Sequence, residues 1–209
     1  MGTSASGRRV GVLGGTFDPP HIGHLVVAGE ALWRLRLDEV WLIPAHLSPH
    51  KPTGAHGTPG QRLRWTRALA EGYPALRVRT DELDRPAPSF TADTMEAIAT
   101  AEPGTDLWFL LGSDQLEALP TWHEPARILS VARIGAVPRD GHDAEDVRAI
   151  GARVAPGRVD VVDAPHVGVS STLVRERVAA GVPVRHLVPP GVHDALIADG
   201  LVPSATVPT

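Results

Sequence analysis

The clearest candidate for chemistry is the segment GGTFDPPHIGH, residues 14–24. Gly14 and Gly15 end a short apolar run, where glycine lets the backbone approach a ligand closely and adopt positive φ angles. His21 and His24 are three residues apart, so on a helix both imidazoles lie on one face of the first turn. A helix start also offers unpaired N–H groups and the positive end of the helix dipole. This pattern predicts a polyphosphate site in which the imidazoles donate hydrogen bonds as charge shifts in a transition state.

Other phosphate motifs fit this segment less well. It is not a P-loop, because no Gly-Lys-Ser/Thr closes it, and it is not the dinucleotide fingerprint GxGxxG. A single histidine in a helix is more often structural than functional. The complete eleven-residue string, in which Thr16 adds a hydroxyl, favours phosphate binding instead.

A second candidate is the segment VSSTLVR, residues 169–175. The hydroxyls of Ser170 and Thr172 stand at an expected helix start, and Arg175 follows about one turn later as a multi-donor fork for the same anion. Taken alone, the segment reads as a helix cap followed by a solvated arginine. Beside the first motif, it predicts a second set of phosphate contacts.

The elements that must position these residues alternate between strand and helix. Such alternation predicts an α/β fold with a Rossmann-like, doubly wound, mostly parallel sheet. We expect a single domain over residues 1–209, with a small C-terminal helical part from about residue 165. Ligands of such folds bind at the carboxyl ends of the strands, and both motifs fall there. The expected strands are 9–13, 39–43, 76–80, 106–111, 133–138 and 159–162, and the expected helices are 21–35, 58–72, 89–101, 170–181 and 190–199.

Composition narrows the function further. The 209 residues are 43% hydrophobic, as in ordinary globular proteins, and contain no cysteine, which excludes thiolate chemistry. A net charge of −4 argues against broad nucleic-acid binding. No apolar run approaches the roughly 18 to 20 residues that cross a bilayer, and no signal peptide is recognisable, so we expect a cytoplasmic protein without a membrane partner.

Both motifs resemble those of a known superfamily. Residues 14–24 are similar to the nucleotide-binding signature of the nucleotidyltransferases, and residues 169–175 resemble their ISSTxxR pattern. Residues 21–24 also spell the HIGH motif of class I aminoacyl-tRNA synthetases. Those enzymes are generally much longer and pair this motif with a KMSKS loop, which this chain lacks.

Further segments resemble one branch, the bacterial nicotinate-nucleotide adenylyltransferases. They follow the family's order along nearly the whole chain. Departures include Phe90 where tyrosine is frequent, His123 where another aromatic is common, and the surroundings of Arg139. The matching segments are PAHLSPHK at 44–51, PSFTADTM at 88–95, LGSD at 111–114, LPTW at 119–122, VPRDG at 137–141 and LVPP at 187–190.

The resemblance implies an adenylyltransferase that joins nicotinate mononucleotide to the AMP part of ATP in NAD biosynthesis. It implies that Mg²⁺ arrives with ATP and needs few or no protein ligands. The implied catalytic residues are His21, His24, Lys51 and Arg175. The implied ATP-binding residues are Gly14, Gly15, Thr16, Phe17, His21, His24, Gly112, Arg139, Ser170, Thr172 and Arg175. The implied acceptor-binding residues are Thr16, Lys51, Thr91, Asp114 and Trp122.

Several alternatives stay open at this point. The acceptor can be the amide mononucleotide, or another small phosphate such as phosphopantetheine or glycerol phosphate, although those relatives lack the Thr91 and Trp122 segments as a set. A nucleotide sensor without activity and a metal site built on His46 and His50 are further readings, and Pro49 argues against the helix that such a metal site would need. Trp122 can also be a core residue, Lys51 a solvated charge and Asp114 a helix cap. The sequence leaves open whether the chain forms a homo-oligomer.

Overall fold

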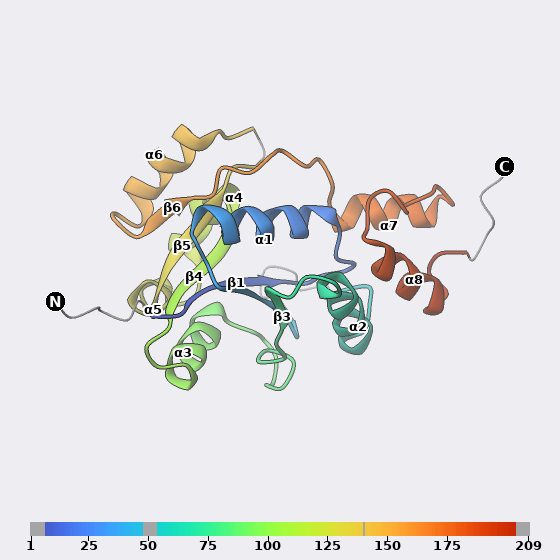
Figure 1. The fold of residues 1–209 in the computed structure, drawn as a ribbon, viewed down its shortest axis with the longest axis horizontal. Helices are drawn as coiled ribbons and strands as arrows, with labels where there is room; N and C mark the ends of the chain where they lie inside the picture. Colours follow the sequence, from blue (N-terminus) through green and yellow to red (C-terminus); the bar gives the residue numbers. More distant parts are fainter. Residues whose placement is uncertain (1–6, 48–53, 140, 204–209) are drawn as a thin grey trace.

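The computed structural model describes residues 7–47, 54–139 and 141–203. Its centre is a six-stranded sheet in the order β3-β2-β1-β4-β5-β6, and every neighbouring pair is parallel. The order reverses between β1 and β4, which lie side by side in the middle. This confirms the Rossmann-like α/β fold (Figure 1). The strands are β1 Arg9–Gly15, β2 Glu39–Pro44, β3 Leu76–Val78, β4 Asp106–Gly112, β5 Ala132–Val137 and β6 Val159–Val161.

Side chains alternate between the two faces of the sheet and build a core on each. Leu13 and Leu42 pack with Ala28 and Ala31 of helix α1, whereas Val12 packs with residues of helices α3 to α6. Figure 1 shows α1 above the sheet and α3 below it. The helices are α1 Ile22–Arg34, α2 Pro59–Ala70, α3 Thr91–Ala101, α4 Ser113–Ala118, α5 Pro125–Val131, α6 Ala144–Val154, α7 Ser171–Ala179 and α8 Pro190–Ala198, with a short 3-10 turn, η1, at Leu119–Thr121.

The helix starts follow the cap signals with one correction. Thr58 and Gln61 form a capping box on α2, and the Ser170 hydroxyl accepts from Leu173 N at the start of α7. Ser89, in contrast, does not cap α3, because its hydroxyl accepts from His46 N instead. The sequence also did not reveal α4, α5 and α6. None of the helices that the structure describes is long and apolar enough to span a membrane.

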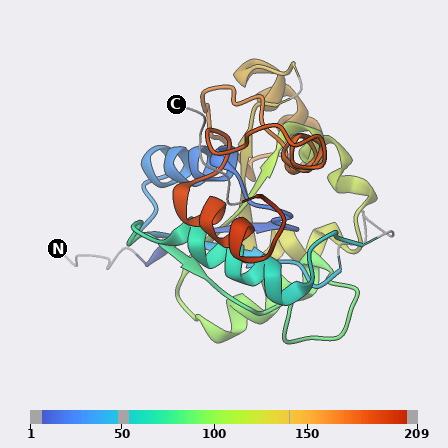
Figure 2. The same cartoon turned by 90° about the vertical axis from the view of Figure 1, so that its right-hand side faces the viewer.

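The C-terminal helices lie beyond the carboxyl end of β1. In Figure 1, β1 runs from left to right and α7 and α8 lie at its right-hand side. Figure 2 looks at this end and shows α8 beside α2, in agreement with their direct contact. The late segment is therefore next to the turn that follows β1.

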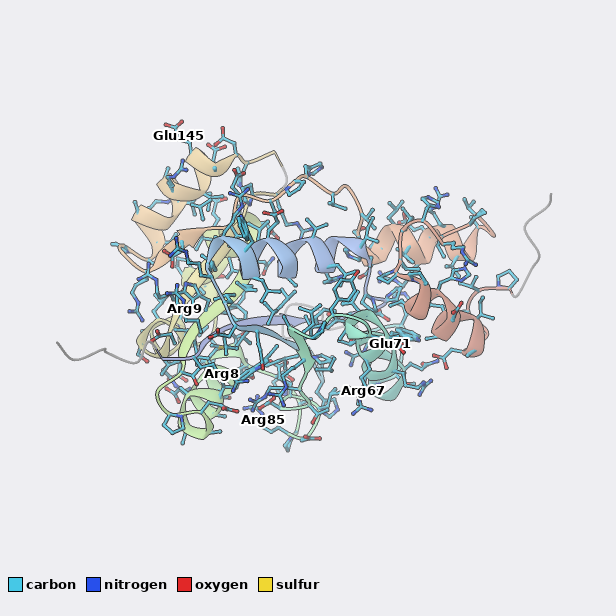
Figure 3. The ribbon with its side chains drawn as sticks, viewed as in Figure 1. Arg8, Arg9, Arg67, Glu71, Arg85 and Glu145 are labelled. Atoms are coloured by element: carbon cyan, nitrogen blue, oxygen red, sulfur yellow. The ribbon has the colours of Figure 1, made fainter. Side chains whose placement is uncertain are left out.

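The amino end of the sheet is closed by arginines stacked on tryptophans. Arg8 lies over the ring of Trp41 at 5.3 Å and Arg9 over that of Trp108 at 4.7 Å, while Arg8 also pairs with Glu39 at 2.7 Å. Figure 3 shows Arg8 and Arg9 at this left-hand end, away from α7 and α8. These contacts stabilise the fold at the amino end of the sheet.

Candidate active site

A cavity of about 830 Å³ opens at the carboxyl ends of β1 and β4. Its walls come from the turn after β1, the start of α1, the segment before α3, the segment 121–123, and residues 137–139 and 164–170. Eleven of the site residues predicted from the sequence line it: Gly14, Gly15, Thr16, His21, His24, Thr91, Gly112, Asp114, Trp122, Arg139 and Ser170.

Three of the described candidates do not line this cavity. Phe17 is buried, Thr172 is exposed, and Arg175 borders a second cavity of about 220 Å³. Lys51 lies outside the described residues, as does His50 of the weighed metal site. Among the described residues, no cluster of three histidines or carboxylates could hold a metal ion.

The turn after β1 is shaped differently from expectation. We expected Gly14 and Gly15 to take positive φ angles, but neither does; the positive φ of 49° belongs to Phe17. The Phe17 ring is 1% exposed and lies 4.9 Å from the ring of His24. A buried aromatic ring therefore anchors the turn in the core.

The two histidines are held by backbone N–H groups at their Nδ1 atoms. Gly23 N donates to His21 Nδ1 at 3.2 Å, and His21 N donates to His24 Nδ1 at 3.1 Å. Because each Nδ1 accepts, the ring proton of each histidine lies on Nε2. The rings lie 4.0 Å apart. The helix start thus holds two neutral imidazoles, each with Nε2–H as its donor.

The charge state of His21 agrees with this arrangement. Burial, with a smaller contribution from the positive charge of Arg139, lowers the pKa of His21 from 6.5 to about 4. Arg139 passes close over Gly112, where an added Cβ would meet Arg139 Cδ at 2.7 Å. Its backbone is fixed by Ser113, whose hydroxyl accepts from Arg139 N at 2.9 Å and donates to Arg139 O at 3.0 Å. Gly112 and Arg139 therefore line the same cavity as His21.

The late motif is tied to the first by hydrogen bonds across more than 150 residues. Ser171 Oγ donates to Pro19 O at 2.8 Å, and Arg175 donates to Asp18 O at 2.6 Å. The same guanidinium donates to Thr172 Oγ1 at 3.1 Å. These bonds place the start of α7 against the turn after β1, with Arg175 on the outer side of that turn.

Another part of the cavity lining is aromatic. The ring of Trp122 meets Phe109 edge-on at 6.0 Å, and His123 lies against Phe90 at 4.2 Å. Within the described residues, no side chain caps the start of α3 at Thr91. The first backbone N–H groups of α3 therefore have no side-chain acceptor among these residues. A flat ring with an anionic group could lie on Trp122 and point its charge at these backbone N–H groups.

Asp114 lines the same cavity, at the start of α4. Its Oδ2 accepts from Gln115 at 2.9 Å, while its buried Oδ1 has no hydrogen-bond partner among the residues that the structure describes. A buried carboxylate oxygen without a donor is costly, and a ligand hydroxyl at this point would supply one.

Sequence reasoning missed two buried charges under the turn. The Asp18 carboxylate is 3% exposed and accepts from His56 N and Gly57 N at 2.8 Å each. Arg62 is 1% exposed and donates to three backbone carbonyls. Asp18 stood within the first motif and could have been singled out, whereas nothing local marks Arg62 as buried.

Comparison with known proteins identifies the family of this chain. The family model described as cytidylyltransferase-like matches residues 12–177. The chain is 38% identical to a probable nicotinate-nucleotide adenylyltransferase of Geobacillus kaustophilus, over 92% of this chain and 85% of that protein. It is 40% identical to the protein of the same description from Dehalococcoides mccartyi, over 92% and 96% of the two chains.

Solved structures support the fold. The nicotinic acid mononucleotide adenylyltransferase of Plasmodium falciparum, in a structure with NaAD, superposes with a TM-score of 0.74 at 15% identity, over 93% of this chain and 97% of that one. At that identity the likeness concerns the fold alone. The two curated relatives, together with the family model that covers most of the chain, settle its membership. The chain belongs to the nicotinate-nucleotide adenylyltransferase family of the cytidylyltransferase-like superfamily.

Proposed function

We propose that the cavity at the carboxyl ends of β1 and β4 is the active site for the adenylyltransferase reaction of this chain. That reaction joins nicotinate mononucleotide and ATP in NAD biosynthesis. The proposal rests on one observation above all: His21 and His24 present two neutral Nε2–H donors on the helix that leaves the phosphate-binding turn.

The reaction needs no protein nucleophile. A phosphate oxygen of the mononucleotide attacks the α-phosphorus of ATP, the bond from that phosphorus to the bridging oxygen breaks, and pyrophosphate leaves with the electron pair. The second pKa of a phosphate monoester is about 6, so the attacking group is already ionised at neutral pH. Catalysis therefore depends on alignment and on stabilising charge on the phosphoryl oxygens.

The ATP end is the turn after β1 with the start of α1. Gly14 and Gly15 let the nucleotide approach the backbone, Thr16 adds a hydroxyl, and His21 and His24 donate to the reacting phosphate. Neutral donors suit this place, because they stabilise developing charge without binding the ground-state anion as tightly as a cation does. Phe17 holds the turn from below. The remaining ATP contacts are assigned to Gly112, Arg139, Ser170, Thr172 and Arg175.

Arg175 serves the triphosphate from the outer side of the turn. Its guanidinium donates to Asp18 O and to Thr172 Oγ1 in this structure. A guanidinium has five N–H donors, so two bonds leave others for the β- and γ-phosphates once ATP is bound. With His21, His24 and Lys51, it completes the proposed catalytic set.

The acceptor end is the aromatic part of the cavity. The pyridine ring stacks on Trp122, and its carboxylate lies at the N–H groups of α3 near Thr91, where no described side chain competes. Asp114 Oδ1 accepts from a ribose hydroxyl, which satisfies its buried oxygen. Thr16 and Lys51 approach the acceptor phosphate.

Magnesium fits this site as a companion of ATP. Among the described residues, no cluster of three metal-binding side chains is present, and the described carboxylates on the cavity wall are Asp114 and Glu82, which accepts from Thr94. Such a donor set suits an ion held by phosphate oxygens and water, which is how Mg²⁺ prefers to bind. Its charge would offset that of the leaving pyrophosphate.

We further propose that the chain is one nucleotidyltransferase domain, with a helical part from about residue 165, that works in the cytoplasm where its substrates are. Neither a membrane nor a nucleic acid is needed for this chemistry. Sedimentation at working concentration would determine whether it forms a homo-oligomer.

The deciding experiment measures pyrophosphate release with ATP and one acceptor at a time. We expect turnover with nicotinate mononucleotide, and a lower kcat/KM with the amide mononucleotide. Phosphopantetheine and glycerol phosphate should give no release above background. Preferred use of either of these, or no release with any acceptor, would refute the proposed function.

A further inference from the structure

Arg62 is an arginine buried in the first turn of α2. Its side chain donates through Nε to Gly57 O at 3.2 Å, and through its two terminal nitrogens to Thr16 O at 2.9 Å and His46 O at 3.0 Å. The residue is 1% exposed. The Asp18 carboxylate supplies the nearby opposite charge. A single guanidinium therefore connects three separate backbone segments.

Two of these segments lead to the two parts of the cavity to which the proposed function assigns ATP and the acceptor. Thr16 belongs to the turn after β1, which is the ATP end. His46 is hydrogen-bonded to the segment before α3: its N donates to Ser89 Oγ at 3.1 Å, and its Nδ1 lies 2.9 Å from Arg85 O. Figure 3 shows Arg85 in that lower segment. Ser89 stands two residues before Thr91, so His46 connects Arg62 to the acceptor end.

This arrangement exceeds what a helix anchor requires. An apolar side chain of similar length could fill the same volume in the core. Only a planar fork with several fixed N–H directions can satisfy three carbonyls of three segments at once. Lysine has one nitrogen on a flexible stem and cannot span the same three positions.

We propose that Arg62 is a positioning residue that sets the separation between the ATP end and the acceptor end of the cavity. It acts through the backbones of Thr16 and His46 and touches no substrate. An in-line transfer requires both reactants in one alignment, and a misplacement of about 1 Å costs on the order of a hundredfold in rate. This inference rests on the proposed function of the two ends.

The test compares ligands that occupy one end with a ligand that spans both. A non-hydrolysable ATP analogue and nicotinate mononucleotide each report on one end, whereas nicotinate adenine dinucleotide joins the two. In Arg62→Lys, we expect the Kd of the dinucleotide to rise at least about tenfold and kcat to fall about thirtyfold or more. The Kd of each single-end ligand should stay within about threefold of its wild-type value, because each end keeps its own side chains.

Thr66→Val is the matched control. Thr66 is fully buried on the same helix, and its hydroxyl donates to Arg62 O at 2.7 Å, so the variant loses a buried hydrogen bond without touching the guanidinium contacts. We expect a lower Tm with an unchanged ratio of dinucleotide to mononucleotide affinity. If Arg62→Lys does not fold, Arg62→Gln is measured in the same way.

Two results would overturn the inference. One is equal weakening of all three ligands in the Arg62 variant. The other is a selective loss of dinucleotide affinity in Thr66→Val as well, which would mark a consequence of lower stability. A wild-type protein that forms no dinucleotide at all would instead refute the proposed function.

Discussion

Gly23 stands in the first turn of α1, against the ring of His21. In Gly23→Ala, the added Cβ would lie 2.9 Å from His21 Nδ1 and 3.0 Å from Cε1. Such contacts are favourable only near 3.5 Å, so the ring must move by about 0.6 Å. His21 is 9% exposed and lies 4.0 Å from the ring of His24, which leaves little room. The shift lengthens the bond from Gly23 N and turns Nε2 from its direction, so we expect kcat/KM to fall by about 30- to 100-fold.

The same substitution should not destabilise the protein. Alanine is favoured over glycine in a helix by up to about 1 kcal/mol, which offsets a cost of about 0.5 to 1.5 kcal/mol for a displaced ring. We therefore expect Tm to stay within about 4 °C of wild type. Gly29→Ala is the matched control, because Gly29 lies on the same helix and an added Cβ there meets nothing within 4 Å. That variant should gain stability and keep its kcat/KM.

Coupled pyrophosphate release measures the rates, and thermal unfolding measures the Tm of both variants. An active Gly23→Ala enzyme would show that the position of the His21 ring does not matter to the reaction. A large fall in Tm together with lost activity would show that the substitution acts through the fold. Either result would refute the reasoning.

Three other variants test the same site. His24→Ala removes one donor and should lower kcat by about a hundredfold with little change in Tm; near-normal turnover would remove His24 from the reaction. Because the pKa of His21 is about 4 in the folded protein and 6.5 in its ordinary state, the unfolded chain binds the proton more tightly. The free energy of unfolding should then fall by up to about 3 kcal/mol as the pH drops from 7 to 4, and His21→Asn should flatten that part of a urea-unfolding profile. Trp122→Ala should raise the KM for nicotinate mononucleotide about tenfold and leave that for ATP within about threefold; an unchanged KM would assign Trp122 to the core.

Much of the fold was predictable because the strands are buried on both faces. Segments such as residues 40–43 and 107–111 are continuous apolar runs between turn signals, which is typical of a parallel sheet. Helix α6 was not foreseen, although Asp143 and Asp146 form a capping box at its start. The sequence does contain two acidic residues three positions apart at this point. A capping box, however, usually has Glu or Gln rather than Asp at its N3 position.

The residue types of the candidate site were predictable from the sequence. The residues that hold them in place were less predictable. Eleven of the predicted residues line one cavity because both motifs follow strands of one parallel sheet. The positive φ of Phe17 was missed, since glycine is the usual residue there. The contact of Arg62 with Thr16 spans 46 positions, and no local pattern encodes a bond whose two ends meet only after the sheet has formed.

The residues that position the site matter because this reaction moves no proton through the protein. The acceptor phosphate is ionised above about pH 6, and the His21 ring, with a pKa of about 4, stays neutral over the same range. If His21 worked as a general base, its ionisation would shape kcat near pH 4, and displacing the ring would shift that pH profile. If it works as a fixed donor, displacing the ring lowers kcat by one factor at every pH from 7 to 9. Gly23→Ala moves the donor within one end, and Arg62→Lys moves one end against the other. Under the positioning account both variants should lose rate on the scale of His24→Ala, although neither removes a group that touches substrate.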